Sequence, residues 1–270
     1  MPELPEVETT MRGITPHILH CKIIRSTIRQ KKLRWPIADD FHAQTQGQQI
    51  AAITRRSKYL LIHLQSTTII WHLGMSGSLR LVDKKTPLEK HEHVDIEFDN
   101  GRILRYKDPR RFGALLLCDD LKQLTLLNKL GPEPLGPDFD GDWLYKCSQG
   151  RSAPVKTFIM DAKNVVGVGN IYAAESLFMA GIHPTRPAGK ISLARYQHLA
   201  QCIKKVLSSA IEQGGTSLND FVQSDGQPGY FAIELKVYGR AGKACPNCHS
   251  ILKNKVIGQR ASVYCSDCQH

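Results

Sequence analysis

The stretch Tyr59-Leu-Leu-Ile-His-Leu-Gln-Ser-Thr-Thr-Ile-Ile-Trp-His-Leu73 holds two short runs of apolar and β-branched residues around a polar turn. Runs of this kind, bounded by turn residues, are typical of paired β-strands. Similar runs lie at 23–28, 93–98 and 102–106. Between the last two, Asp99-Asn-Gly101 is a strong hairpin turn. From about residue 15 to 120 the residues therefore predict an antiparallel β-sandwich or barrel.

Outside this region the pattern becomes helical. The opening segment 3–18 is predicted to be a helix with Pro5 in its first turn. Residues 170–180 and 193–212 carry apolar side chains at three- and four-residue spacing, as amphipathic helices do. Between sheet and helices, the stretch 130–137 holds three prolines and two glycines, so neither helix nor strand can continue there. The sequence thus predicts an α+β protein whose two main parts are joined by a linker.

Four cysteines near the C-terminus form two Cys-x-x-Cys pairs, Cys245 with Cys248 and Cys265 with Cys268. This spacing supplies four thiolates for tetrahedral zinc, and a site with all four positions filled by protein is structural. The run between the pairs suits a β-hairpin whose turn projects Gln259 and Arg260. A segment of this size buries too little apolar surface to fold alone, so we expect one Zn²⁺ to supply much of its folding free energy.

The chain of 270 residues carries 36 Lys and Arg against 25 Asp and Glu, a formal net charge of +11. Such an excess attracts polyanions, and nucleic acid is the expected partner, although a merely basic soluble protein would show the same balance. The longest apolar stretches are too short to cross a bilayer. The acidic, proline-rich N-terminus lacks the features of a secretion signal. We therefore expect a cytoplasmic protein with no membrane partner, and buried free thiols at Cys21, Cys118, Cys147 and Cys202.

The N-terminus Met1-Pro-Glu3 offers a nucleophile. Removal of Met1 would expose the secondary amine of Pro2, whose pKa of about 8 lies well below the value of about 10.4 for lysine. More of this amine is neutral at physiological pH, and a neutral amine can attack carbon and form a covalent intermediate. Glu3 and Glu6 lie beside it in sequence and can transfer protons. The same residues also suit an ordinary helix start with acidic side chains in the first turn, so this motif alone leaves both interpretations open.

A second candidate site precedes the predicted helix 170–180. Gly167-Val-Gly-Asn170 ends in a residue type that caps helices strongly, and free amides at a helix start favour a phosphate. Asn170 is therefore predicted to be the N-cap. A plain cap without a ligand would have the same sequence.

Motifs spread over the whole chain carry a family resemblance. They are Met1-Pro-Glu-Leu-Pro-Glu-Val-Glu-Thr9, Arg56-Ser-Lys58-Tyr, His72-Leu-Gly-Met-Ser-Gly77, Asp108-Pro-Arg-Arg-Phe-Gly113, Gly167-Val-Gly-Asn-Ile-Tyr172 and Gly258-Gln-Arg260. In this order they resemble the bacterial formamidopyrimidine-DNA glycosylases, also called 8-oxoguanine DNA glycosylases. The resemblance implies an N-terminal helix plus antiparallel β-sandwich at 1–130, a linker or hinge at 131–150, a helix-two-turn-helix domain with a lesion-covering loop at 151–234, and a zinc ribbon at 235–270.

The resemblance also implies the activity. The protein would be a bifunctional DNA glycosylase and AP lyase that excises oxidised purines, 8-oxoguanine and formamidopyrimidines, from damaged double-stranded DNA in base excision repair. Pro2 would attack C1′ and form a Schiff base, with Glu3 as proton donor for base excision and Glu6 as a supporting carboxylate. Lys58 and Arg260 would be the general acids for β- and δ-elimination.

DNA contacts follow from the same resemblance. DNA-binding positions of the family match His91, Arg110 and Arg151. The gap left by the everted base would be filled by Met75, Arg110 and Phe112. Phosphate contacts are implied for His72, Lys156, Asn170 and Tyr238. Without the resemblance, Met75 and Phe112 would be interpreted as core residues, whereas Arg110, beside Asp108, could equally form a surface ion pair.

Two other functions compete with this one. The sister enzyme, endonuclease VIII, removes oxidised pyrimidines, but its group resembles Met-Pro-Glu-Gly at the start, whereas this chain has Leu4. The segment 217–235 also resembles the loop that covers an everted oxidised purine. A non-catalytic zinc-ribbon DNA-binding protein would explain the charge and the cysteines, but would leave Pro2 and Lys58 without a role. We expect a monomeric, nucleoid-associated repair enzyme.

Overall fold

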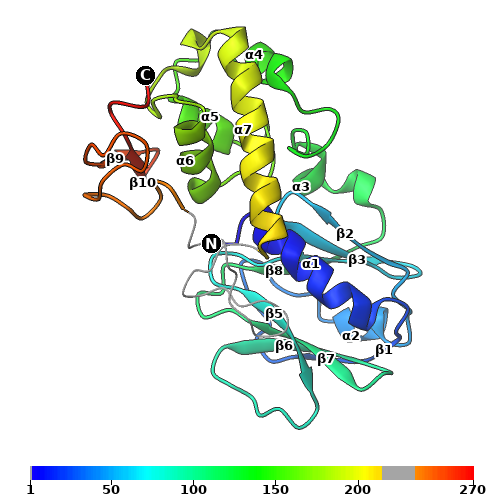
Figure 1. The fold of residues 1–270 in the computed structure, drawn as a ribbon. Helices are drawn as coiled ribbons and strands as arrows, with labels where there is room; N and C mark the ends of the chain where they lie inside the picture. Colours follow the sequence, from blue (N-terminus) through cyan, green and yellow to red (C-terminus); the bar gives the residue numbers. More distant parts are fainter. Residues whose placement is uncertain (1, 215–234) are drawn as a thin grey trace. The chain divides into compact units, whose positions relative to one another are not determined.

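The computed structural model describes residues 2–214 and 235–270 (Figure 1). These residues belong to two compact units. The first comprises residues 2–128 and 213–214, and the second comprises 129–212 and 235–270. Apart from Leu235, the predicted loop at 217–235 lies outside the described residues.

The first unit opens with helix α1 (Leu4–Ile18), as the sequence predicts. Glu3 stands at its N-cap, and the Glu3 backbone N–H donates to Glu6 Oε2 at 2.7 Å, one half of a capping box. Apolar side chains on one face, including Val7 and Ile14, are fully buried. The opposite face of α1 is polar and exposed to water, so the helix packs on the sandwich with its apolar face.

Two four-stranded sheets follow, and all their strand pairs are antiparallel. The first has the order β1-β6-β7-β5, with bounds β1 (Ile23–Ile28), β6 (Glu92–Phe98), β7 (Arg102–Lys107) and β5 (Ser78–Asp83). The second has the order β2-β3-β4-β8, with bounds β2 (Ala52–Arg56), β3 (Tyr59–His63), β4 (Thr68–His72) and β8 (Ala114–Cys118). A short helix, α2 (Phe41–Thr45), packs beside β1.

One apolar core joins the two sheets. It contains Leu60 and Trp71 from the second sheet, Ile96 and Tyr106 from the first, and Ile18 from α1, all almost fully buried. The two sheets therefore pack face to face as a sandwich, which decides between the two architectures that the residues left open. After β8 come a 3₁₀ turn (Leu121–Gln123) and the short α3 (Thr125–Asn128).

The second unit is helical. Its elements are α4 (Gly141–Ser148), α5 (Val155–Met160), α6 (Asn170–Met179), a 3₁₀ turn (Ala188–Lys190) and α7 (Leu193–Glu212). The two predicted helices appear as α6 and α7, which pack on each other, and α4 packs on α7 (Figure 1). Asp140 Oδ1 caps α4 by accepting from the Trp143 backbone N–H at 2.7 Å.

Helix α4 lies inside the range 131–150 that the sequence analysis treats as linker or hinge. The proline- and glycine-rich stretch 130–137 itself forms neither helix nor strand, as expected. The four domain ranges stay predictions.

The second unit ends in a small module with the hairpin β9 (Lys253–Ile257) and β10 (Arg260–Tyr264). Gly258 and Gln259 form its two-residue turn and both have positive φ, +54° and +63°, the conformation that such tight hairpins need. Both Gln259 and Arg260 are exposed at this turn, as predicted. An apolar cluster, including Phe178 of α6 and Val263 of β10, packs the module on α6.

Two other sequence predictions can be compared with the structure. None of the described helices is long and apolar enough to cross a membrane. Of the four scattered cysteines only Cys202 is buried, whereas Cys21, Cys118 and Cys147 are half-buried, so burial of all four was a wrong expectation.

Candidate functional site

The first described residues of the chain are buried. Pro2 is buried, and Glu3 and Glu6 are each only 1% exposed. The Glu6 carboxylate accepts from the Glu3 backbone N–H, and the Glu3 carboxylate accepts from the Glu6 backbone N–H, so both carboxylates are held at the first turn of α1. The predicted nucleophile is therefore followed directly in the chain by two buried, hydrogen-bonded carboxylates.

Lys58 belongs to the tight turn between β2 and β3, where Arg56 pairs with Tyr59 and Ser57 has a positive φ of +57°. An ion pair ties this hairpin to α1, because Arg55 Nε lies 2.8 Å from Glu8 Oε2 with both side chains largely buried. The Arg55 guanidinium also donates to the Ser57 carbonyl at 2.8 Å. The helix that carries Pro2 and the turn that carries Lys58 are therefore fastened to each other.

His72, at the end of β4, is held as a neutral imidazole. Burial, aided by the positive charges of Lys58 and Arg34, lowers its pKa to about 4, against a smaller opposing effect of Asp108. Its Nδ1 accepts from the Gly74 backbone N–H at 3.1 Å, which leaves the proton of the neutral ring on Nε2. As a phosphate contact, which stays a prediction, His72 would act as a neutral donor.

The predicted gap-filling residues lie on two neighbouring turns. Phe112 is 46% exposed, and the Arg110 guanidinium lies over its ring at 4.8 Å from the centroid. Met75 is half-buried on the other turn. Neither residue is a core residue, and Asp108 is fully buried rather than a surface partner of Arg110. The alternative interpretations from sequence therefore fail for Phe112 and Arg110.

His91 adjoins the turn that carries Phe112. Its φ of +72° is unusual for a residue with a side chain, and its carbonyl accepts from the Asp108 backbone N–H at 3.0 Å. On the same side, His93 Nε2 lies 2.9 Å from the Asp108 carbonyl oxygen. Four predicted DNA-binding residues, His91, Met75, Arg110 and Phe112, thus gather around one buried aspartate.

In the second unit, Lys156 and Asn170 fasten the hairpin that carries Arg260. Lys156 is 1% exposed, and its ammonium donates to Asn170 Oδ1 at 2.6 Å, to the Ala261 carbonyl at 3.2 Å and to the Ser262 hydroxyl. Asn170 Nδ2 donates to the same Ala261 carbonyl at 3.2 Å. Both residues therefore hold β10 on the helices α5 and α6.

The predicted capping role of Asn170 is wrong. Gly169 is the N-cap of α6 and Asn170 is its first helical residue. The reason is tertiary, because the Asn170 carboxamide is directed to Lys156 and to the hairpin. Its phosphate contact, and those of Lys156 and Tyr238, stay predictions. Arg151 lies apart from this group, exposed on the segment between α4 and α5.

A buried carboxylate places Tyr238. Glu175 of α6 is 5% exposed and accepts three backbone N–H donors, from Lys236 at 2.9 Å, Val237 at 3.0 Å and Tyr238 at 2.8 Å. Three amides that would otherwise lack partners are satisfied by one side chain. The start of the C-terminal module is thereby anchored to α6.

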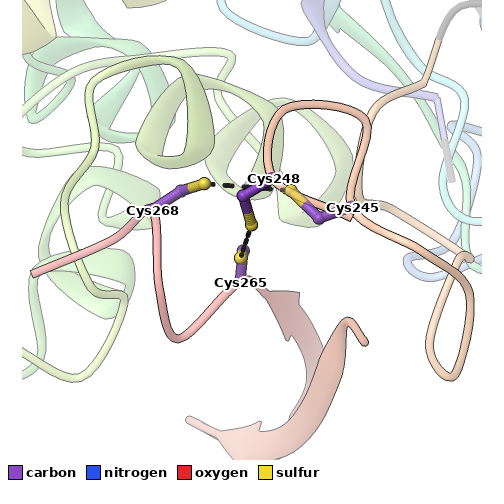
Figure 2. A group of neighbouring side chains, drawn as sticks. All are labelled: Cys245, Cys248, Cys265 and Cys268. Carbon is purple, nitrogen blue, oxygen red and sulfur yellow. Dashed lines mark hydrogen bonds between the residues drawn. The ribbon is translucent and has the colours of Figure 1, made fainter. Parts of the chain in front are cut away.

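The four cysteine sulfurs form one cluster, with every pair within 4.8 Å (Figure 2). The Sγ atoms of Cys245 and Cys268 lie 3.9 Å apart, and those of Cys248 and Cys265 lie 3.4 Å apart. Four thiolates at a Zn–S distance of about 2.3 Å on a tetrahedron have edges of about 3.8 Å. The cluster therefore fits one tetrahedral zinc ion, as predicted from the spacing.

Sequence reasoning missed the residues that hold this site together. Asp108 was considered only as a surface partner of Arg110, Ser76 stands inside a motif without a role, and Glu8, Arg34 and Glu175 were not singled out. Each sits in a local pattern that suits an ordinary charged or polar surface. Burial distinguishes Asp108 and Glu175, and burial of a charged side chain has no signal in a single sequence.

Comparison with known proteins agrees with this architecture. The model of the formamidopyrimidine-DNA glycosylase N-terminal domain matches residues 1–115, and that of the formamidopyrimidine-DNA glycosylase H2TH domain matches 130–222. The formamidopyrimidine-DNA glycosylase of Stutzerimonas stutzeri (strain A1501) is 60% identical over 269 residues, which cover 100% of both chains. That of Alcanivorax borkumensis is 57% identical over 270 residues, again covering 100% of both.

Solved structures agree as well. The crystal structure of the MutM (Fpg) protein from Thermus thermophilus has a TM-score of 0.89 at 34% identity, covering 99% of this chain and 98% of that one. The complex of Lactococcus lactis Fpg with abasic-site DNA has a TM-score of 0.91 at 32% identity and covers 99% of both chains. With family models matching most of its length and relatives this similar from end to end, the chain belongs to the formamidopyrimidine-DNA glycosylase family.

Proposed function

We propose that the protein is a bifunctional DNA glycosylase and AP lyase that excises oxidised purines, 8-oxoguanine and formamidopyrimidines, from double-stranded DNA. The observation that carries the proposal is the buried Pro2, followed by the buried Glu3 and Glu6 at the start of a helix that is fastened to the Lys58 turn. Related Lactococcus lactis Fpg structures contain Fapy-dG DNA and abasic-site DNA, which supports a lesion-bearing duplex as the substrate.

The chemistry begins at the nitrogen of Pro2, which becomes a free secondary amine when Met1 is removed. Its lone pair forms a bond to C1′ of the damaged nucleotide, the glycosidic bond breaks, and the electron pair of that bond leaves with the base, which takes up a proton from Glu3. The Pro2 nitrogen then loses its own proton, a C1′=N double bond forms, and the C1′–O4′ bond breaks with a proton going to O4′. The opened sugar is then an iminium ion, which makes the C2′ proton acidic. Loss of that proton expels the 3′ phosphate, with Lys58 as the proposed acid. A second elimination expels the 5′ phosphate, with Arg260 in that role, and water releases Pro2.

Zinc, held by the four cysteines, would supply no step of this chemistry. Its thiolates leave no open position for substrate, so its contribution is the folded hairpin that presents Arg260. The proposed ligands of the phosphate backbone are His72, Arg151, Lys156, Asn170 and Tyr238. A net charge of +11 favours this partner, and we expect a monomer that acts in the cytoplasm at the nucleoid.

Borohydride trapping tests the proposal. Reduction of the iminium ion should join the protein covalently to DNA that contains 8-oxoguanine opposite cytosine, and peptide mapping should place the linkage on Pro2. The variant Pro2→Gly, whose primary amine forms a less reactive imine, should trap at least about tenfold less, a loss of about 1.4 kcal/mol in transition-state stabilisation.

Three results would contradict the proposal. Linkage to a lysine would overturn the assignment of Pro2. Preferential trapping on an oxidised pyrimidine would favour the endonuclease VIII activity. Tight binding without any trapping would favour a non-catalytic zinc-ribbon DNA-binding protein.

A further inference from the structure

Two chain crossings lie side by side at one end of the sandwich. Residues 73–77 carry the chain from β4 in the second sheet to β5 in the first, and residues 108–113 carry it back from β7 to β8. Because β4 pairs with β8 and β5 pairs with β7, these crossings run next to each other. They carry Met75 on one side, and Arg110 and Phe112 on the other.

The crossings approach each other backbone to backbone. A Cβ on Gly74 would lie 2.4 Å from the Gly113 nitrogen, and a Cβ on Gly113 would lie 1.8 Å from the Tyr106 hydroxyl oxygen. Gly74 also has a φ of +73°, which favours glycine. The contact is therefore possible only without side chains at these two positions.

The hydrogen bonds between paired strands end where the crossings begin, and there the Asp108 side chain accepts hydrogen bonds in their place. Its carboxylate is fully buried and accepts four donors: Ser76 Oγ at 2.9 Å, the Arg110 N–H at 3.3 Å, the Tyr106 hydroxyl at 3.1 Å and the Gly113 N–H at 2.9 Å. Hydrogen bonds to a charged group that is shielded from water are strong and directional. One side chain thus satisfies donors from both crossings.

Ser76 is the link that spans the two crossings. It belongs to the first, donates to Asp108 and accepts from the Arg110 backbone N–H at 3.3 Å in the second. Tyr106 adds a second link, since its hydroxyl lies 3.1 Å from Asp108 Oδ2 and 3.3 Å from the Leu73 carbonyl oxygen. Burial and the nearby Asp108 carboxylate raise the pKa of Tyr106 well above its usual value, so this hydroxyl remains a donor.

We propose that Ser76, Asp108 and Tyr106 are positioning residues that join the two crossings into one rigid wedge carrying Met75, Arg110 and Phe112. This role rests on the proposed function, in which that wedge enters the helix as the damaged nucleotide leaves. Unstacking a base step costs free energy, so a wedge on independently mobile turns would lose part of the insertion free energy in ordering them. The hydrogen bonds that Ser76 and Tyr106 make to Asp108, here called the clamp, order the two crossings before DNA arrives and so remove that cost.

The test separates insertion from chemistry by using two substrates. The variants are Ser76→Ala and Tyr106→Phe, each of which removes one donor from Asp108. The control is Ser26→Ala, which removes a 7% exposed hydroxyl bonded to Thr45 elsewhere in the same sandwich. The substrates are duplex DNA with 8-oxoguanine opposite cytosine, which requires insertion, and a single strand with a preformed abasic site, which does not.

We expect each clamp variant to excise 8-oxoguanine from the duplex about tenfold or more slowly, the effect of losing one hydrogen bond to a charged group. Cleavage of the single strand should change less than about twofold, and the control should match the unchanged protein on both substrates. Stopped-flow fluorescence of a 2-aminopurine beside the lesion should show the same slowing in the insertion phase.

Each other result has a separate meaning. Equal losses on both substrates would show a merely structural role and overturn the clamp, as would unchanged duplex excision. If Ser76→Ala fails to fold, Tyr106→Phe, which keeps the ring that fills the core, decides the question. Failure of the unchanged protein to cleave either substrate would instead overturn the proposed function.

Discussion

At the scale of single residues, burial and the positive charges of Lys58 and Arg34 keep His72 neutral. Its pKa is about 4 in the folded protein, whereas a histidine in an unfolded chain titrates near 6.5. Between these two values the unfolded chain binds a proton that the folded protein does not bind. The free energy of unfolding should therefore be unaffected by His72 above pH 6.5 and should fall as the pH drops toward 4, by up to about 3 kcal/mol.

Urea denaturation at pH 7 and pH 4.5 measures this effect, with the variant His72→Gln as the comparison. The unchanged protein should lose more stability than the variant between the two pH values, because other titrating groups are common to both. An imidazole NMR titration of His72 with an inflection near 6.5 would contradict the assignment.

The same scale shows what a sequence can and cannot specify. The four cysteines were identified as a metal-binding cluster because their chemistry depends on residue type and spacing along the chain. Pro2 and Glu3 could not be assigned in this way, because their motif also suits an ordinary helix start, and their predicted roles rest on the family resemblance. Asn170 was misjudged because its side chain bonds to Ala261, about ninety residues away in the sequence. A capping preference is a local tendency, and here a tertiary partner outweighs it.

At the scale of elements, β7 offers a matched pair of arginines. Arg105 is 4% exposed and lies 2.9 Å from Asp95 and 3.3 Å from Glu92, both of them buried carboxylates on β6. Arg102, on the same strand, is 46% exposed and lies 3.1 Å from the exposed Asp83. Replacing one partner of a buried pair leaves uncompensated charge in the interior, whereas water screens an exposed pair.

We expect Arg105→Gln to lower the free energy of unfolding by about 3 kcal/mol, since Arg29 and Arg80 still face the two carboxylates. Arg102→Gln should lower it by less than about 1 kcal/mol. Urea denaturation of both variants at pH 7 measures the difference. Equal losses would mean that water reaches the Arg105 cluster.

The elements themselves were well predicted where a local signal is strong: hydrophobic periodicity for α6 and α7, Pro5 for the start of α1, and the Asp99-Asn-Gly101 turn for the hairpin of β6 with β7. The order of strands within the two sheets was not predicted. It depends on the crossings at 73–77 and 108–113, where glycines permit a close approach that no periodicity signals. Helix α4 was missed because only eight residues form it, too few to show a clear periodicity so soon after the proline- and glycine-rich stretch.

At the scale of the whole molecule, the two units have separate cores, and the cysteine cluster belongs to the second unit alone. Removing zinc with a strong chelator should therefore unfold the C-terminal module and abolish DNA binding while the sandwich stays folded. Binding to a lesion duplex, zinc content and the NMR spectrum of the sandwich core, measured on one sample, test this. Binding that persists after verified zinc loss would contradict it, and restored zinc should restore binding.

The buried start of α1 has a practical consequence for anyone who handles this protein. Chain ends usually accept affinity tags and reporter fusions, because they fray into water. Here Pro2 and Glu3 are packed away, and Glu3 also begins the helix through its bond to Glu6. An added peptide before Pro2 would disturb the helix start as well as acylate the amine, so a purification handle placed there should abolish activity until it is cleaved off.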